Sequence, residues 1–161
     1  MRDMHEAEVV SPCEKVRLTY QDGTERDVLF NDQEVPFPDG KLIVSRTDLK
    51  GVITHCNQSF IDMSGYGEEE LIGEPHHILR HPDMPSAAFG DLWQTVESGR
   101  KWHGYVKNLR KDGRYYWVYA TVIPNIRDGK VVGYTSVRRK PSRSRVDECV
   151  NLYAEMKQAK G

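Results

Sequence analysis

The sequence contains little cysteine, and its three cysteines form no recognisable pattern. Cys13, Cys56 and Cys149 are widely spaced and odd in number, which does not indicate the disulfide framework of a small secreted domain. The C-x-x-C-H motif is absent, which excludes covalently attached c-type haem. Free thiols of this kind are typical of a reducing compartment, so we expect a cytoplasmic protein.

Long apolar runs are also absent. No segment approaches the roughly 18 apolar residues that span a bilayer, and the opening MRDMHEAEVV lacks the apolar stretch of a secretory leader. We therefore expect a soluble chain that makes no membrane contact itself. Such a chain could also be the cytoplasmic part of a membrane-anchored receptor.

Neither sign of charge dominates the sequence. Lys and Arg number 23 against 24 Asp and Glu, which gives a formal net charge of -1. Because a protein that follows nucleic-acid phosphates needs a basic surface, nucleic acid is not an expected partner.

The sequence does have enough apolar material for one core. Its 161 residues are 38% hydrophobic and 29% charged, which fits one domain of about 100 to 150 residues with short extensions. We expect an N-terminal extension over 1–40, a domain over 41–140, and an amphipathic C-terminal helix or linker to an output module over 141–161.

Both extensions carry a pattern of their own. Alternating apolar residues from Val16 to Tyr20, followed by Asp22-Gly23, predict a β-hairpin that pairs 16–20 with about 25–30. At the other end, Ser144 and Asp147 resemble a weak capping box. The apolar stripe of that helix either packs back on the domain or forms a dimer seam; it consists of Val146, Cys149, Val150, Tyr153 and Met156.

Between the extensions, strand and helix patterns alternate. Residues 42–44 and 52–54 predict a first pair of strands, and 102–109, 115–124 and 131–138 predict three more. Short helices lie between, and Pro85 occupies the first position of the longest, which ends near Gly99. The predicted fold is α+β: a five-stranded antiparallel sheet with short helices on one face and a cavity between.

Several runs of residues resemble the flavin-binding PAS domains of bacterial aerotaxis receptors. They are TDLKGVITHCNQSF (47–60), SGY (64–66), RHPDMPSAAFGDLW (80–93), Trp102 and Gly104 before VKNLRKDG (106–113), YYWV, and GYTSVR (133–138). The resemblance covers a little under 60% of the chain. It does not extend to residues 1–40.

This resemblance implies a PAS fold that holds FAD non-covalently between the sheet and the helical segment. The family's functional positions fall on six residues here: Asn57, Arg80, His81, Asp83, Trp102 and Asn108. No catalytic residue and no metal site is implied.

The chemistry of these side chains suits a flavin, although Trp102, Asn108, Asn57 and Asp83 each have an ordinary structural alternative. Trp102 offers a planar face to the ring or is plain core. The Asn108 amide pairs with the flavin edge if it points inward, or is solvated if it points outward. Asn57 serves equally well as a helix N-cap. Arg80 has the planar fork that grips phosphate, with His81 beside it as a donor, whereas Asp83 would hold one of these two or cap a helix.

Other ligands find less support. His77, His81 and Asp83 have a spacing that suggests a metal site, but Pro82 would interrupt the helix needed to align them. Non-covalent haem needs one axial histidine, and the chain has six. A photoreceptor that forms a cysteinyl-flavin adduct needs a cysteine beside the flavin ring in an Asn-Cys-Arg context. Cys56 is followed by Asn57 and Gln58 instead, and it lies on a different element of the fold.

These observations predict a flavin redox or oxygen (energy) sensor without catalytic turnover, since no dinucleotide-binding glycine motif or catalytic constellation is present. Its expected partners are a second copy of the chain, and a downstream signalling domain or a chemotaxis or kinase partner. The alternative is a haem-binding or ligand-free PAS module used for dimerisation and docking.

Overall fold

The computed structural model describes residues 1–160 and contains the five-stranded antiparallel sheet predicted from the sequence. Its strand order is β4-β3-β7-β6-β5. The strands are β3 (Ile43–Thr47), β4 (Ile53–Cys56), β5 (Trp102–Leu109), β6 (Tyr115–Arg127) and β7 (Lys130–Arg139). The expected α+β fold is therefore confirmed.

Tight turns determine how far the strands extend. Asp128 and Gly129 both have positive φ angles, 53° and 76°, as in the two-residue type I′ turns that match strand twist. Because this turn is so short, β6 and β7 pair as far as Arg127 and Lys130, beyond the predicted ends at 124 and 131.

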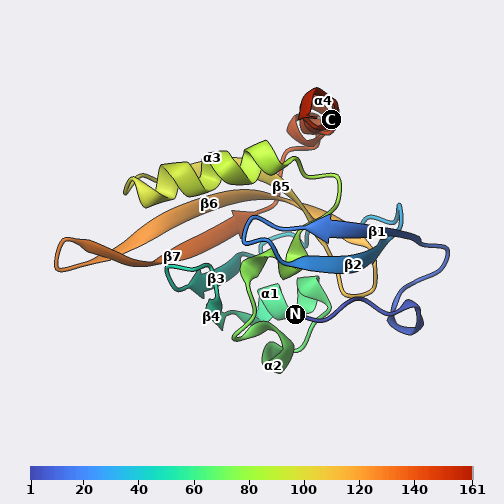
Figure 1. Ribbon diagram of the computed structural model, residues 1–161, viewed down its shortest axis with the longest axis horizontal. Coiled ribbons are helices and arrows are strands. Elements are labelled where there is room, and N and C mark those ends of the chain that lie inside the picture. Colours follow the sequence, from blue (N-terminus) through green and yellow to red (C-terminus); the bar gives the residue numbers. More distant parts are fainter. Residues whose placement is uncertain (161) are drawn as a thin grey trace.

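Short helices follow the first strand pair and lie on one face of the sheet. They are α1 (Gln58–Ser64), α2 (Glu68–Leu71), the 3₁₀ helix η2 (His76–Leu79) and α3 (Ser86–Glu97). The expectation that Pro85 is the first helical residue was wrong by one position: Pro85 is the N-cap, with an extended ψ of 144°. Figure 1 shows α3 running alongside β6.

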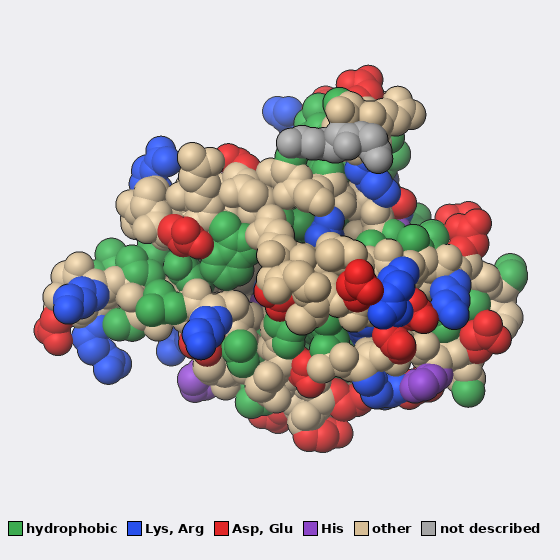
Figure 2. Space-filling model, viewed as in Figure 1, with side chains coloured by type: hydrophobic (Ala, Val, Ile, Leu, Met, Phe, Trp, Pro, Cys, Tyr) green, Lys and Arg blue, Asp and Glu red, His purple; other side chains and the backbone are tan. Residues whose placement is uncertain are grey.

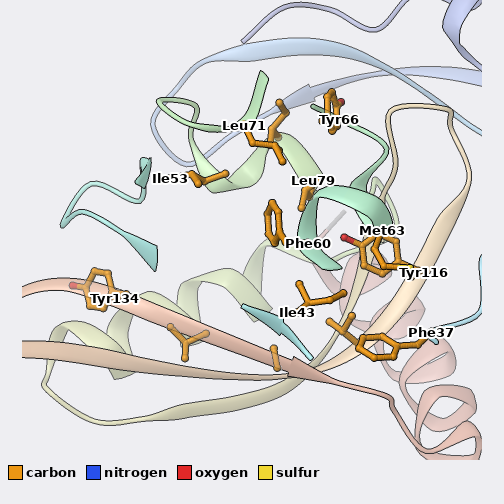
Figure 3. Close-up of a cluster of buried hydrophobic side chains, with 14 of the residues drawn as sticks. Phe37, Ile43, Ile53, Phe60, Met63, Tyr66, Leu71, Leu79, Tyr116 and Tyr134 are labelled. Carbon is orange, nitrogen blue, oxygen red and sulfur yellow. The ribbon is translucent and has the colours of Figure 1, made fainter. Parts of the chain in front are cut away.

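The main core fills the space between these helices and the sheet. Figure 3 shows Phe60, Met63 and Leu79 of the helical segments gathered near Tyr116 of β6, whereas Tyr134 of β7 lies apart from them. Phe60 and Tyr116 are both 0% exposed. This separation divides the interior into a packed half and a half that contains the cavity described below.

The N-terminal extension forms the short 3₁₀ helix η1 (Glu6–Glu8) and the hairpin of β1 (Glu14–Thr19) and β2 (Glu25–Phe30). This two-stranded sheet is separate from the main one. It has a small core of its own, which reaches the end of β5 through Leu109; the other members are Met4, Val9, Val28 and Leu29. The extension is thus packed against the domain (Figure 1).

The C-terminal helix α4 (Arg143–Lys160) packs back on the strand β5. Val146 is 1% exposed, and the Tyr153 hydroxyl donates to the Tyr105 carbonyl at 2.6 Å. Ser144 lies inside the helix, so the predicted capping box does not start it. Val150, a member of the predicted stripe, is 49% exposed and lines a hollow between α4 and the domain together with Lys107 and Trp117.

No helix within residues 1–160 has the length and apolar character needed to cross a membrane.

Candidate ligand cavity

A cavity of about 760 Å³ lies between η2, α3 and the inner face of the sheet. This size is within the range of small-molecule and cofactor sites, roughly 300 to 1,000 Å³. Figure 2 shows a hollow below α3 with hydrophobic side chains on its wall. The turn between β3 and β4 and the tip of the N-terminal hairpin complete the rim.

The apolar walls face each other across a slot. From α3 come Phe89, Leu92, Trp93 and Val96; from the sheet come Trp102, Val106, Ala120 and Val122. The register explains the sheet side, since Trp102 is paired with Val122 and lies two residues from Gly104. Alternate residues of a strand share a face, so these side chains all point inward.

Trp102 is 7% exposed and contributes to this wall. Its indole Nε1 donates to Asp91 Oδ2 of α3 at 2.9 Å. Because this bond satisfies the only polar atom of the ring, the remaining ring surface is free for apolar contact. The tryptophan therefore combines a structural role with a place on the cavity wall.

Asn108 points inward, which decides between the two orientations considered from the sequence. It is 4% exposed and lines the cavity. Among residues 1–160, its amide nitrogen Nδ2 has no hydrogen-bond partner. A buried donor without a partner costs about 1 to 3 kcal/mol, so this position is explained if a ligand accepts the bond.

Arg138 is a second buried donor on the wall, and it carries a charge. It is 3% exposed and donates to Ser45 Oγ at 2.9 Å and to His76 Nε2. Its Nη1 finds no acceptor in the described part of the chain. Burial lowers the pKa of Arg138 to about 10, so the guanidinium is charged at neutral pH.

His76 stays neutral beside this guanidinium. Burial, followed by the Arg138 charge, lowers the pKa of His76 to about 3. Its Nε2 accepts from Arg138, which places the imidazole proton on Nδ1. The Arg138 charge is thus hydrogen-bonded but not neutralised by this neighbour.

Arg80 lies at the junction of η2 and the sheet. Its backbone forms an isolated antiparallel bridge with Asn108, and its guanidinium lies over the Phe89 ring, 4.9 Å from the centroid. Nη2 donates to Ser86 Oγ at 3.2 Å, whereas Nε has no partner within residues 1–160. Arg80, Trp102 and Asn108 are therefore brought together around one cavity.

The other three predicted site residues lie outside the cavity lining. Asn57 caps α1: its Oδ1 accepts from Phe60 N at 3.0 Å. His81 is 1% exposed, and its Nδ1 accepts from Asp83 N at 3.0 Å. The Asp83 carboxylate accepts from Lys107 Nζ at 2.8 Å. The Asn57 contact is the capping role considered from the sequence. The Asp83 carboxylate does not hold Arg80 or cap α3: it is paired with Lys107 and lies 3.8 Å from His81 Nδ1.

The metal alternative gains no support from the geometry. Within residues 1–160, no three His, Cys, Asp or Glu side chains form a group able to hold a metal ion. His77 and His81 have different surroundings, because His77 lines the cavity and His81 packs edge-on against Phe30 and Tyr115.

Sequence reasoning missed several residues of the wall, above all Arg138, His76 and Trp93. Trp93 is part of the apolar periodicity of α3, and such periodicity predicts core equally well. Arg138 had a usable signal: it shares strand parity with Ser136 and Tyr134, which marks a charged residue on an inward face.

Comparison with known proteins identifies the architecture. The family described as "PAS fold" matches residues 53–138, more than half of the chain. The chain belongs to the PAS family. The cavity of this PAS domain lies within the matched region, except for the wall supplied by the N-terminal hairpin and by the end of β3 and the turn after it.

Curated relatives of this PAS domain include receptors and regulators. It is 46% identical to the aerotaxis receptor of Escherichia coli (strain K12) over 121 residues, which are 75% of this chain and 24% of the receptor. It is 33% identical to phototropin-2 of Oryza sativa subsp. japonica, over 56% of this chain and 10% of that protein. The chain thus spans about a quarter or less of the length of these relatives.

Solved structures show the same fold. The PAS domain of a protein from Colwellia psychrerythraea is 27% identical, with a TM-score of 0.58 over 63% of this chain and 87% of that one. The light state of the Aureochrome1 LOV photoreceptor has a TM-score of 0.62 at 22% identity, over 68% of this chain and 88% of that one.

We expect the stability of the PAS domain to fall as the pH drops below 6.5. Burial lowers the pKa of His81 to about 3, whereas an unfolded histidine titrates near 6.5. Between these values the unfolded chain binds more protons, so the free energy of unfolding decreases with falling pH, by up to about 1.4 kcal/mol per pH unit for each such histidine.

Denaturant unfolding at pH 7 and pH 5 measures this dependence, with His81→Gln as the matched variant. Because that variant lacks one titrating group, it should lose less stability over the interval than the unsubstituted protein. Equal losses in the two proteins would contradict the burial of a neutral His81.

Proposed function

We propose that this PAS domain binds FAD non-covalently and acts as a redox or oxygen (energy) sensor in bacterial signal transduction, as in chemotaxis. The observation that carries the proposal is the set of buried donors facing an apolar slot. Asn108 Nδ2, Arg138 Nη1 and Arg80 Nε lack partners within the described chain and belong to residues that line the same cavity. A flavin combines a flat apolar body with acceptor atoms along one edge and phosphate beyond it.

The residues present fit this ligand part by part. Trp93 and Trp102 offer aromatic surface to the ring, and such contacts contribute about 0.5 to 1.5 kcal/mol beyond area burial. The Asn108 amide can both donate and accept at the ring edge. Arg80 has the guanidinium fork that suits phosphate oxygens.

Similarity to the aerotaxis receptor supports the same conclusion. That relative is 46% identical over three quarters of this chain, and the sequence runs discussed above resemble flavin-binding domains of this receptor family. We base the proposed sensing role and the choice of FAD on that similarity together with the cavity.

A bound flavin supplies the electron chemistry, and the protein supplies orientation and charge. The Arg138 guanidinium favours additional negative charge in the cavity, because its nearest hydrogen-bond acceptors, Ser45 and His76, are neutral. The Asn108 amide orients whatever group accepts its hydrogen bond. Both residues therefore respond to a change of charge at the cavity.

A short loop connects the cavity wall to the C-terminal helix. Arg80 lines the cavity, the Pro82 carbonyl accepts from Lys157 of α4 at 2.7 Å, and Asp83 is paired with Lys107 of β5 at 2.8 Å. We assign His81 and Asp83 to positioning this loop, and Asn57 to holding α1 against β3. A shift at Arg80 would reach Lys157 of α4 through His81 and Pro82.

Signal output requires a partner in this proposal. Residues 41–140 form the sensory unit, 1–40 an extension, and α4 leads to a downstream signalling domain, a chemotaxis protein or a kinase. A homodimer would use the exposed Val150 side of α4. No catalytic turnover and no nucleic-acid contact is assigned to the chain.

The purified protein should be yellow, with flavin absorption bands, and should release FAD on denaturation. Chromatography of the released cofactor distinguishes FAD from FMN. A colourless protein that fails to take up added FAD would contradict the proposal. It would favour the alternative function, a ligand-free PAS module for dimerisation and docking. A Soret band would instead indicate haem, for which the cavity-lining His77 is the candidate ligand.

Replacing Trp102 or Asn108 by Ala should weaken FAD binding about tenfold or more, because each removes a wall contact or a hydrogen bond worth about 1 to 3 kcal/mol. Trp117→Ala is the matched control, since Trp117 is equally buried but packs near Tyr153 of α4, outside this cavity. Fluorescence titration with FAD measures the affinity. Unchanged affinity in both cavity variants, with normal circular dichroism, would show that the flavin binds elsewhere.

A further inference from the structure

The tip of the N-terminal hairpin forms part of the cavity wall. Gln21 and Asp22, in the turn between β1 and β2, line the cavity together with His77 of η2. This hairpin lies outside residues 53–138, which carry the family match. It therefore adds a surface to the ligand site that the PAS core does not supply.

Buried contacts hold the hairpin in this place. Arg26 of β2 is 2% exposed and donates to the Ile78 carbonyl and to the Tyr66 hydroxyl, both at 2.9 Å. Tyr20, which is 3% exposed, stacks on the His77 ring with 4.0 Å between centroids and 11° between planes. The hairpin tip and η2 thus form one continuous wall.

The two carboxylate oxygens of Asp22 have different roles. Oδ1 accepts from Thr24 N at 2.9 Å and from Thr24 Oγ1 at 2.6 Å, which closes the turn. Oδ2 lies 4.0 Å from His77 Nε2, too far for a direct hydrogen bond. Nε2 is buried and has no hydrogen-bond partner within residues 1–160.

This pair offers one acceptor and one donor, with a gap that a single small group can bridge. The Thr24 hydrogen bonds lower the pKa of Asp22, so its carboxylate is ionised, and burial lowers the pKa of His77, so its ring is neutral. A hydroxyl can donate to Oδ2 and accept from an Nε2 proton at once. A phosphate oxygen would be repelled by the carboxylate, and a ring carbonyl could not donate.

We propose that Asp22 and His77 form a hydroxyl-binding subsite for the sugar of the flavin nucleotide, so that the N-terminal hairpin helps to select and retain the cofactor. The subsite rests on the proposed flavin function. Two sugars share this chemistry: the ribityl chain present in every flavin, and the adenosine ribose that only FAD carries.

Two conservative variants isolate the subsite. Asp22→Asn keeps an amide oxygen for Thr24 and removes the second acceptor. His77→Phe keeps the aromatic stack on Tyr20 and removes the ring nitrogens. Asp27→Asn is the control, because Asp27 is on the same hairpin but pairs with Arg17 at 2.8 Å, away from the cavity. Each protein is titrated with riboflavin, FMN and FAD, followed by flavin fluorescence.

Asp22→Asn and His77→Phe should each weaken binding of FAD about tenfold, the loss expected for one hydrogen bond to a charged or buried group, and Asp27→Asn should not. The double variant should lose little more than either single variant, because both residues hold one hydroxyl. A loss seen with all three flavins identifies the ribityl chain, and a loss confined to FAD identifies the adenosine ribose.

Unchanged FAD affinity in both variants would overturn the subsite while leaving flavin binding intact, as would losses that multiply in the double variant. A loss shared by FMN and FAD but not by riboflavin would assign the pair to phosphate and overturn it as well. If the unsubstituted protein binds none of the three flavins, the flavin function itself fails, and the subsite with it.

Discussion

The requirement that buried hydrogen-bond donors find acceptors is the constraint on which this account depends. Arg138 and Asn108 point from the central sheet into a cavity of about 760 Å³, and each keeps a buried nitrogen that no acceptor within residues 1–160 satisfies. Burying such groups is costly unless something pairs with them. An apolar ligand would leave that cost in place, whereas a ligand that carries acceptor atoms would remove it.

The register of the sheet produces this situation. β6 lies between β5 and β7, so Arg138 is paired with Ala120, which in turn is paired with Gly104. Small residues beside the arginine leave space in one half of the interior, whereas Phe60 and Tyr116 fill the other half. The same backbone pairing thus creates both the cavity and its polar groups.

The sheet could be predicted because strand alternation and turn residues are local signals. The orientation of Asn108 could not be predicted in this way. The strand pattern shows only that Asn108 and Val106 share a face, and which face points inward depends on where the helices pack. Asp22 and His77 are 55 positions apart in the sequence, and no local sequence pattern predicts a contact of that kind. Asn57 illustrates the opposite case, in which the structural alternative considered from the sequence, a helix N-cap, describes the contact that is present.

A crystal structure of the protein with FAD added would test the central claim most directly. We expect one FAD between α3 and the sheet, with acceptor atoms within hydrogen-bond distance of Asn108 Nδ2 and Arg138 Nη1. A cavity that contains only water, or a flavin that leaves both nitrogens without a partner, would contradict it.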